Sequence, residues 1–364
     1  MYRAFLADDI LFAGAGAIFW PRGSAMRLTE LDYNLPPELI AQEPPERRDE
    51  ARLMVLDRRG GTIEHSRFYK LGDFLRDGDL LVLNDTRVFP ARLFARKPTG
   101  GAVELLMVRP VHEPPGAWLA LIRGHRGLRE GTRLVLDDGN ALRIAGYQRP
   151  GRPLVASDDS VPIETILERA GALALPHYID REPAPADRED YQTVYAAQAG
   201  AVAAPMAGLH FTRELLARLA AAGVRTAFVT LHIGPGTFTP LRSPVVEAHT
   251  MEAEWYTIAP ATVEALALAR RTGARVIAVG TSSVRALESH AITGDAEGTT
   301  GLFISPGFRW RAIDAMVTNF HMPRSTVLAM VMAFAGRDEI LDAYREAMRH
   351  RYRFLSYGDA MLIL

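Results

Sequence analysis

The stretch RVIAVGTSSVRALESHAI, residues 275–292, joins two different patterns through a run of small residues. After Arg275, residues 276–279 are apolar and three of them are β-branched, which predicts a short buried strand over 275–279. GTSS follows, and residues 284–292 then carry apolar side chains at helical spacing. A strand that leads directly into a helix is the repeating unit of a parallel sheet covered by helices.

The same order recurs along the second half of the chain. Residues 224–231 and 314–320 are also predicted as strands, and residues 80–83 as a further buried strand. Thr212 is a predicted N-cap, Pro260 opens a helix that Gly273 closes, and another helix starts near residue 326. The sequence therefore predicts an α/β fold with a mostly parallel sheet and flanking helices.

Residues 86–158 have a different pattern of apolar and turn-forming residues. Short strand-like runs alternate with Gly, Pro and Asp, DDGN is a hairpin signal, and no helical pattern stands out. Residues 86–153 hold twelve Arg and Lys against five Asp and Glu, whereas the remainder of the chain is net acidic. We predict an inserted β-barrel domain at 86–158 within an α/β domain of residues 26–85 and 159–364. Its positive charge suggests a polyanionic partner, or only an arginine-rich solvated surface.

Composition excludes several kinds of chemistry. The chain has 364 residues and no cysteine, which removes disulfides, thiolate nucleophiles and iron–sulfur clusters. Lysine occurs only at positions 70 and 97, so Schiff-base chemistry is not expected. Residues 1–25 are predicted as an extension outside the fold, since Asp8 and Asp9 stand where a signal peptide needs positive charge. We expect a cytoplasmic protein that does not span a membrane, with monomer as the default state.

Three predicted strands end in unusual loops. These are TLHIGPGTFTPL at residues 230–241, AVGTSSVRALES at 278–289 and VTNFHMPRSTVL at 317–328. A fourth loop, AAPMAGLHF at 203–211, ends in His210. Because ligands of open α/β sheets bind beyond the carboxyl ends of the strands, we expect these loops to line one crevice. Helix starts there offer unpaired N–H groups to a carboxylate, a ribose hydroxyl or a phosphate, unless Thr281, Ser282 and Ser283 simply cap the helix.

Three histidines stand beside these turns: His210, His232 and His321. A single histidine of this kind is more often structural than catalytic, but three such positions raise the expectation of function. None of these histidines is spaced from another as helical metal ligands are, and no HExxH motif occurs, so no metal is predicted. Near the C-terminus, arginines alternate with four aromatic residues. That pattern predicts base stacking, or an amphipathic helix followed by a terminal strand.

Taken together, these stretches resemble one family, the S-adenosylmethionine:tRNA ribosyltransferase-isomerases of queuosine biosynthesis. The resemblance runs from residue 28 to nearly the end of the chain. The segments that carry it are NDTRVFPARL (84–93), LPHYIDR (175–181), YQTVYAAQAGAVAAPMAGLHF (191–211), TLHIGPGTF (230–238), VGTSSVRALES (279–289), VTNFHMPRST (317–326) and RFLSYGDAMLI (353–363).

The resemblance implies an α/β domain with an inserted β-barrel and an unusual reaction of S-adenosylmethionine. Its ribosyl part moves to the aminomethyl group of a 7-deazaguanine at the wobble position of tRNA, and adenine and methionine leave. S-adenosylmethionine is then a substrate, and no cofactor is implied. A sulfonium acidifies the C–H group beside it, so proton removal, adenine departure and epoxide closure all suit neutral histidine or carboxylate.

The resemblance and the residue chemistry together give three sets of candidates. The acid–base candidates, with no preferred assignment, are His210, His232, His321, Asp85 and Asp359. The predicted substrate contacts are Gly234, Gly236, Thr237, Thr281, Ser282, Ser283, Arg285, Asn319 and Arg324. The predicted tRNA contacts are Arg87, Arg92, Arg96, Lys97, Arg123, Arg126, Arg353 and Tyr357.

Some positions depart from the family pattern, and other functions remain open. Met206 stands where the family usually has threonine, His177 where it has proline, and Glu252 where histidine is common. A phosphoribosyl-type transferase or a methyltransferase would also bind its substrate at loops beyond the strand ends. A methyltransferase, however, should show a Gly-rich loop after its first strand. A non-catalytic RNA-binding protein would keep the basic domain but would not need polar strand ends.

Overall fold

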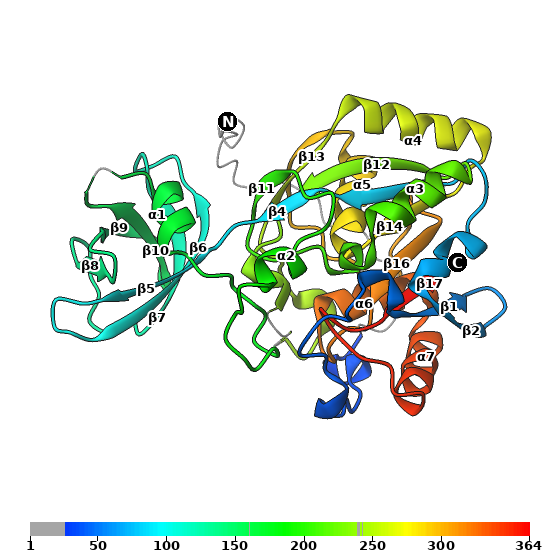
Figure 1. The fold of residues 1–364 in the computed structure, drawn as a ribbon, viewed down its shortest axis with the longest axis horizontal. Coiled ribbons are helices and arrows are strands. Elements are labelled where there is room, and N and C mark those ends of the chain that lie inside the picture. The colour runs from blue at the N-terminus through cyan, green and yellow to red at the C-terminus, as the bar shows by residue number, and fades with distance from the viewer. Residues whose placement is uncertain (1–25, 160, 239–240, 242) are drawn as a thin grey trace.

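The structure is a computed structural model that describes residues 26–159, 161–238, 241 and 243–364. The predicted N-terminal extension, residues 1–25, lies outside the described residues. Two units stand side by side in Figure 1, a large sheet covered by helices and a small barrel. Their order along the chain places the barrel strands between β3 and α3 of the larger unit.

A nine-stranded mixed sheet forms the larger unit. Its spatial order is β15 (Glu297–Thr300), β13 (Glu254–Ile258), β12 (Arg225–Leu231), β3 (Leu80–Asn84), β14 (Val276–Val279), β16 (Ala315–Asn319), β17 (Ala360–Ile363), β1 (Arg52–Asp57) and β2 (Thr62–Arg67). The four central strands, β12, β3, β14 and β16, are parallel neighbours, and β17 also pairs in parallel with β1. The flanks are antiparallel, for instance in the tight β1–β2 hairpin. The predicted α/β class is confirmed, and the parallel arrangement occupies the centre where strands alternate with helices.

Helices cover both faces of this sheet (Figure 1). Alternate residues of the fully buried β3 point to opposite sides: Leu80 and Val82 join one apolar core, and Leu81 and Leu83 join the other. The first core is closed by α4 (Pro260–Thr272), α5 (Thr281–Thr293), α6 (Thr326–Ala335) and α7 (Arg337–Arg349). The second is closed largely by α3 (Arg213–Ala221). Burial on both faces explains why β3 and β14 (Val276–Val279) are almost continuous apolar runs.

Helix boundaries follow local chemistry closely. The Thr212 side chain accepts a hydrogen bond from the amide of Leu215 and caps α3, as predicted. Pro260 is the first residue of α4, and Gly273 ends it with a left-handed φ of 70°. α5 begins at Thr281, three residues earlier than the apolar spacing predicts, so Thr281, Ser282 and Ser283 form its first turn and none is its cap. The residue before that turn, Gly280, has a φ of 84° that only glycine adopts readily.

The smaller unit is a closed six-stranded barrel. Its strands are β10 (Arg152–Ser157), β7 (Trp118–Arg123), β6 (Ala102–Pro110), β5 (Arg92–Arg96), β8 (Arg133–Leu136) and β9 (Ala141–Arg149), in that order around the barrel. α1 (Ile163–Ala170) comes after the barrel strands, yet Ile163, Ile166 and Leu167 belong to the barrel core.

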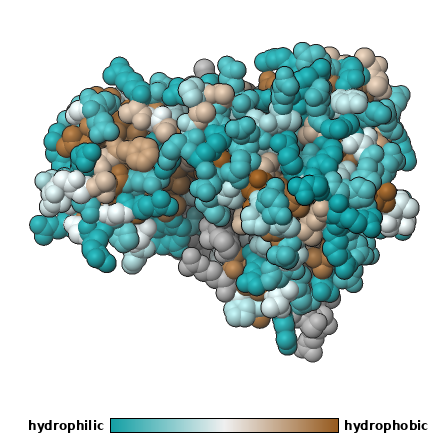
Figure 2. Space-filling view, turned by 60° about the horizontal axis from the view of Figure 1, so that its bottom comes forward, coloured by the Kyte–Doolittle hydropathy of each residue, from teal (hydrophilic) through white to brown (hydrophobic). Residues whose placement is uncertain are grey.

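A short parallel pair lies outside both the sheet and the barrel. β4 (Thr86–Val88) carries the chain from β3 toward the barrel, and β11 (Gln198–Ala201) pairs with it after the chain has passed the short α2 (Asp187–Asp190) on its return. Figure 2 shows the two units as lobes with a hollow between them and mostly hydrophilic side chains on this face. Within the described residues, no helix has the length and apolarity to cross a membrane.

Candidate functional site

The carboxyl ends of the four central strands meet at one edge of the sheet, because these strands are parallel neighbours. A pocket of about 770 Å³, including its open mouth, lies beyond this edge. The pocket is lined by Tyr178, Ala204, Pro205, Met206, Ala207, Ile233, Gly280, Thr281, Ser282, Thr318, Asn319, His321, Met322, Pro323, Ser325, Val327 and Leu355.

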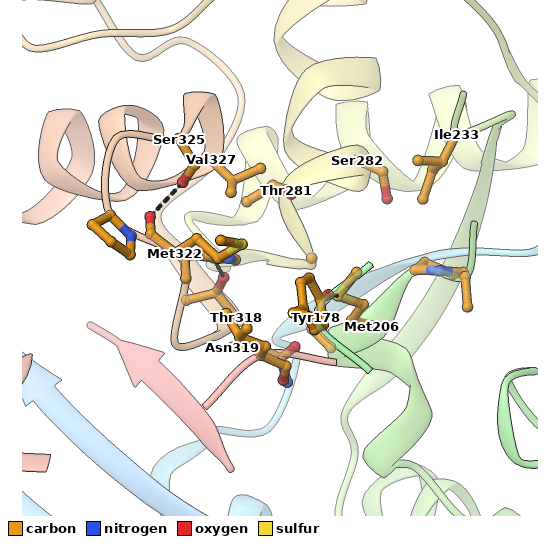
Figure 3. A pocket seen from close by; sticks show the side chains of 17 residues that line it. Tyr178, Met206, Ile233, Thr281, Ser282, Thr318, Asn319, Met322, Ser325 and Val327 are labelled. Atoms are coloured by element: carbon orange, nitrogen blue, oxygen red, sulfur yellow. Dashed lines mark hydrogen bonds between the residues drawn. The ribbon is translucent and has the colours of Figure 1, made fainter. Parts of the chain in front are cut away.

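All four loops singled out in the sequence contribute to this pocket. The loop at 203–211 supplies Met206 and its neighbours, and the loop after β12 supplies Ile233. Figure 3 shows Thr281 and Ser282 at the start of α5, near Ser325 and Val327 at the start of α6. The expected common crevice is therefore present, and two helix starts open onto it.

Asn84, at the end of β3, forms hydrogen bonds to several segments at this edge of the sheet. Its buried side-chain amide donates to the carbonyl of Leu231, at 3.0 Å, and to Oγ of Ser282, at 2.9 Å. Its Oδ1 accepts from the amides of Thr86 and Leu231, each at 3.1 Å. One side chain thus links β3, the end of β12 and the start of α5. The sequence shows Asn84 within a matched segment, but its role depends on contacts more than 140 residues away.

Among the three predicted histidines, His321 lines the pocket. Its half-buried ring pairs through Nε2 with Oγ1 of Thr318, at 2.7 Å, and its backbone amide donates to the hydroxyl of Tyr344. His210 lies behind the pocket wall, where Nε2 pairs with the side-chain amide of Asn319, at 3.2 Å. Only Asn319 of that pair reaches the pocket, so His210 positions a lining residue.

His232 is placed differently again. Its ring stacks on Trp255 with 5.0 Å between centroids, and its Nδ1 pairs with Oγ1 of Thr86 at 2.8 Å. A Cβ at Gly200 would lie 2.5 Å from its Nε2, so glycine is required for this packing. His232 is not among the residues that line the pocket.

Burial keeps all three histidines neutral. Desolvation lowers the pKa of His210 to about 4, that of His232 to about 4 and that of His321 to about 3. A neutral imidazole at neutral pH can accept a proton and does not repel a cationic ligand. Neutrality is what these pKa values establish; a base works best with a pKa near the operating pH, so the case for His321 as a base rests on its position at the pocket wall.

We predict that stability falls as the pH drops below about 6.5, because buried His210 and His232 resist protonation. In the unfolded chain these histidines bind protons below that pH, whereas in the folded protein they stay neutral until about pH 4. Each contributes up to about 1.4 kcal/mol per pH unit to the loss. Urea unfolding at about pH 7 and about pH 5 measures the slope, which His210→Gln should reduce and His125→Ala, at an exposed barrel position, should not. A flat profile between these pH values would contradict the prediction.

The two predicted carboxylates differ in their surroundings. Asp85 follows β3 and accepts a hydrogen bond from Oγ1 of Thr230 at 2.6 Å, and burial raises its pKa. Asp359 is buried and accepts from the amides of Arg52 and Arg353, at 2.8 and 2.7 Å, and from the Arg52 guanidinium. These contacts lock the turn before β17. Neither carboxylate lines the pocket.

A second, smaller cavity shares Ile233, Thr281, Ser282 and Val327 with the pocket. A buried ion pair between Arg285 and Glu254 lies at its wall. Arg285 also donates to the carbonyls of Leu302 and Thr300, and Glu254 accepts from the amide of Gly234 at 2.7 Å. The predicted substrate contacts Arg285 and Gly234 are thus joined to each other through a carboxylate that the sequence analysis did not single out.

Thr326 lines the same small cavity at the start of α6. Its buried Oγ1 has no hydrogen-bond partner among the described residues. An unsatisfied buried hydroxyl is costly, so it is available to a ligand group.

The remaining predicted substrate contacts are not among the described residues that line the pocket. Ser283 is buried and donates to the carbonyl of Val279 at 2.7 Å, away from the pocket. Arg324 is exposed and pairs with Asp32. Gly236 approaches Glu252, and the Thr237 side chain is outside the described part of the chain.

The predicted tRNA contacts are mostly on the surface. Arg87, Arg96, Arg123 and Arg126 are exposed, and Nζ of Lys97 donates to the carbonyl of Arg126 at 2.7 Å. Arg92 is half-buried and pairs with Glu104 and Glu182. Arg353 donates to the carbonyl of Glu43 at 3.1 Å.

Tyr357 requires a correction. It is buried, and its hydroxyl donates to Asp187 at 2.7 Å. Tyr344, Tyr352 and Phe354 are buried as well, so the C-terminal aromatic residues build the core around α7 and β17. A buried ring has no face for a base, and base stacking by Tyr357 is therefore wrong for this structure.

Several lining residues were missed by the sequence analysis. The hydroxyl of Tyr178 shares a hydrogen bond with Oγ of Ser356, at 2.6 Å. It also contacts the sulfur of Met206, the residue that stands where threonine is usual. Met322 and Thr318 complete the wall. Their motif context was the only signal in the sequence, because an apolar side chain carries no mark of facing a ligand.

Comparisons with known proteins agree with this geometry. Residues 28–363 match the family model described as queuosine biosynthesis protein. The chain belongs to this family. The queuosine biosynthesis match covers both the barrel and the sheet, including every residue that lines the pocket.

Relatives in the queuosine biosynthesis family are similar over nearly their full length. Proteins named S-adenosylmethionine:tRNA ribosyltransferase-isomerase from Anaeromyxobacter sp. (strain Fw109-5) and Thermotoga maritima are 51% and 48% identical, over 93% of this chain and 99% and 100% of theirs. The crystal structure of S-adenosylmethionine tRNA ribosyltransferase from Thermotoga maritima aligns with 92% of this chain and all of its own, at a TM-score of 0.53 and 38% identity.

Proposed function

We propose that this protein transfers and isomerises the ribosyl moiety of S-adenosylmethionine onto a 7-aminomethyl-7-deazaguanine at the wobble position of tRNA. The products would be epoxyqueuosine-tRNA, adenine and methionine. The observation that carries the proposal is the pocket at the carboxyl ends of β12, β3, β14 and β16, lined by all four matched loops. The names of the relatives support the reaction class.

The pocket suits a sulfonium cation. No arginine or lysine is among the described residues that line it, and its histidine is neutral. Tyr178 places an aromatic side chain at the pocket wall, and an aromatic ring that meets a cation face-on contributes about 0.5–2 kcal/mol. Met206 and Met322 add polarisable contacts around an apolar chain.

Two helix starts suit the methionine carboxylate of the substrate. The amides of the first turn of α5 have no partner within their helix and lie beside Thr281 and Ser282 at the pocket wall. The start of α6 adds Ser325 and Val327. Unpaired N–H groups and the helix dipole together stabilise an anion at such positions. In this arrangement Arg285 supports the wall through Glu254 and need not reach the substrate.

His321 is the acid–base group that we assign to the reacting centre. It lines the pocket, and its Nε2 is oriented by Thr318. Proton removal next to the sulfonium needs an unprotonated base, and the low pKa of His321 keeps its ring unprotonated. Asn319, held from behind by His210, is the second polar group at this wall.

The barrel is the proposed tRNA surface. We predict that replacing Arg96 and Arg126 together with glutamate weakens tRNA binding by roughly tenfold or more and lowers the salt slope by about two. Binding of S-adenosylmethionine should not change, because neither residue lines the pocket. Filter binding across a salt series measures the effect, with Arg271→Glu on the exposed side of α4 as the matched control. Equal losses with Arg271→Glu would contradict a barrel-centred surface.

The decisive experiment combines the protein with S-adenosylmethionine and a tRNA that carries the aminomethyl-deazaguanine. Free adenine and an RNA mass increase equal to the added epoxycyclopentanediol are expected. Methylated RNA, or adenine release with no change in RNA mass, would contradict the assignment.

The expected setting of the reaction is simple. We propose that the protein acts as a cytoplasmic monomer and that the reaction needs no cofactor, since every step suits imidazole, hydroxyl or carboxylate groups. Light scattering after size exclusion measures the mass in solution, and activity after extensive dialysis against chelator tests the requirement for a metal.

A further inference from the structure

Two histidines and a glutamate lie together outside the candidate pocket. His65 is on the edge strand β2, whereas Glu346 and His350 are one turn apart at the end of α7. Oε1 of Glu346 is 3.4 Å from Nε2 of His65 and 2.8 Å from Nε2 of His350. None of the three lines the candidate pocket.

The 3.4 Å between His65 and Glu346 matches two ligands of one metal ion, and the 2.8 Å between Glu346 and His350 would have to open by about 0.5 Å, a small movement for the exposed His350 ring. Zinc binds imidazole nitrogen and carboxylate oxygen at about 2.0–2.2 Å, and two ligands at a tetrahedral angle then lie about 3.3–3.5 Å apart. All three candidate ligand atoms are within 4.8 Å of one another. The helical i, i+4 spacing of Glu346 and His350 puts both on the same face of α7.

Surrounding residues orient the three side chains. Nδ1 of His65 pairs with the hydroxyl of Tyr352 at 2.8 Å, which leaves Nε2 directed toward Glu346. Arg349 binds the other carboxylate oxygen, Oε2, which leaves Oε1 directed toward the two imidazoles. The Tyr352 hydroxyl and the Arg349 guanidinium thus act as outer partners that orient the ligands, as is usual around metal sites.

We propose that His65, Glu346 and His350 bind one divalent transition metal ion of the zinc class, with a fourth position open to water. Exposed fractions of 37%, 20% and 48% for these side chains leave the ion accessible from solvent. This departs from the expectation of no metal, which considered only histidines near the strand ends. The sequence separation of His65 from the other two ligands hid the group.

The ion would cross-link two parts of the chain that are distant in sequence. It would fasten the β1–β2 hairpin to the end of α7, directly before the turn whose Leu355 lines the candidate pocket. Arg52 reinforces the same junction, since it lies over the Tyr352 ring at 4.3 Å and pairs with Asp359. The expected role is structural, so the proposal stands apart from the ribosyl transfer.

The test is calorimetric titration of tag-free, chelator-treated full-length protein with zinc chloride at neutral pH. One ion per chain is expected, and His65→Ala or His350→Ala should weaken binding by about tenfold or more. Tyr352→Phe, which keeps all three ligands, should weaken it by about 10–100-fold. His125→Ala removes an exposed histidine from the barrel and should bind as the parent does.

A second readout covers variants that fold poorly. Cobalt added to the parent protein should give visible absorption bands of a tetrahedral site, which His350→Ala should lack while its circular dichroism matches the parent. No saturable zinc binding by the parent would overturn the proposal. Unchanged binding in a folded double variant, His65→Ala with His350→Ala, would also overturn it, because the ion would then be held elsewhere.

Discussion

Replacement of His321 by alanine is expected to lower kcat by about 10²–10⁴-fold, the usual contribution of a positioned acid or base. His321 lines the pocket, and burial lowers its pKa to about 3, so it is a neutral acceptor at working pH. The affinity for S-adenosylmethionine should change little, since a base contributes mainly in the transition state. Single-turnover release of adenine, together with calorimetric binding of S-adenosylmethionine, separates the two effects.

Two variants sharpen this prediction. His290→Ala removes a half-buried histidine from α5 that does not line the pocket, and it should retain parental kcat. Thr318→Val removes the hydroxyl that pairs with Nε2 of His321 and should give an intermediate loss through misorientation of the ring. If folded His321→Ala kept the parental kcat, His321 would be excluded as the base, and Asp85 would be the next candidate.

Replacement of Glu254 by alanine is expected to cost about 3–5 kcal/mol of folding free energy, because Arg285 would remain buried without its partner. The amide of Gly234 would also lose its acceptor, which loosens the loop after β12. Urea unfolding followed by circular dichroism measures the loss. S-adenosylmethionine binding should weaken in parallel, since both residues of the ion pair stand at the wall of the smaller cavity.

The double variant Glu254→Met with Arg285→Met provides the comparison. Apolar side chains of similar size remove both charges at once, so this variant should be more stable than Glu254→Ala. If the double variant were as unstable as the single one, the cost would come from lost packing and not from an uncompensated charge.

Much of the fold was predictable because its signals are local. Thr212, Pro260 and Gly273 set helix ends through their own hydrogen bonds and backbone angles. The buried runs of β3 and β14 identified central strands. The antiparallel flanks were not distinguished, since strand direction depends on which neighbour a strand finds. The start of α5 was placed too late, because Thr281, Ser282 and Ser283 have weak helix propensity. The turn forms after Gly280, the N-cap, and Asn84 hydrogen-bonds to Ser282 within it.

The candidate site was predictable only to the level of its loops. Parallel strands bring their carboxyl ends to one edge, so the loops that follow them had to meet. Which side chain on each loop faces the pocket was not encoded locally. His210, His232 and His321 looked equivalent in sequence, yet only His321 lines the pocket. Tyr357 looked suited to RNA, yet its ring is needed in the core beside Tyr191.

By itself the sequence determined the alternation of strands and helices, the basic barrel segment and the set of loops at the strand ends. Each of these depends on side-chain periodicity, charge or turn chemistry within a few residues. Tertiary structure alone decided the partners: Asn84 with Ser282, Arg285 with Glu254, and His65 with Glu346 and His350. Those pairings join residues that are distant in the chain. Their geometry follows from how the sheet, helices and hairpin pack, which local sequence patterns do not specify.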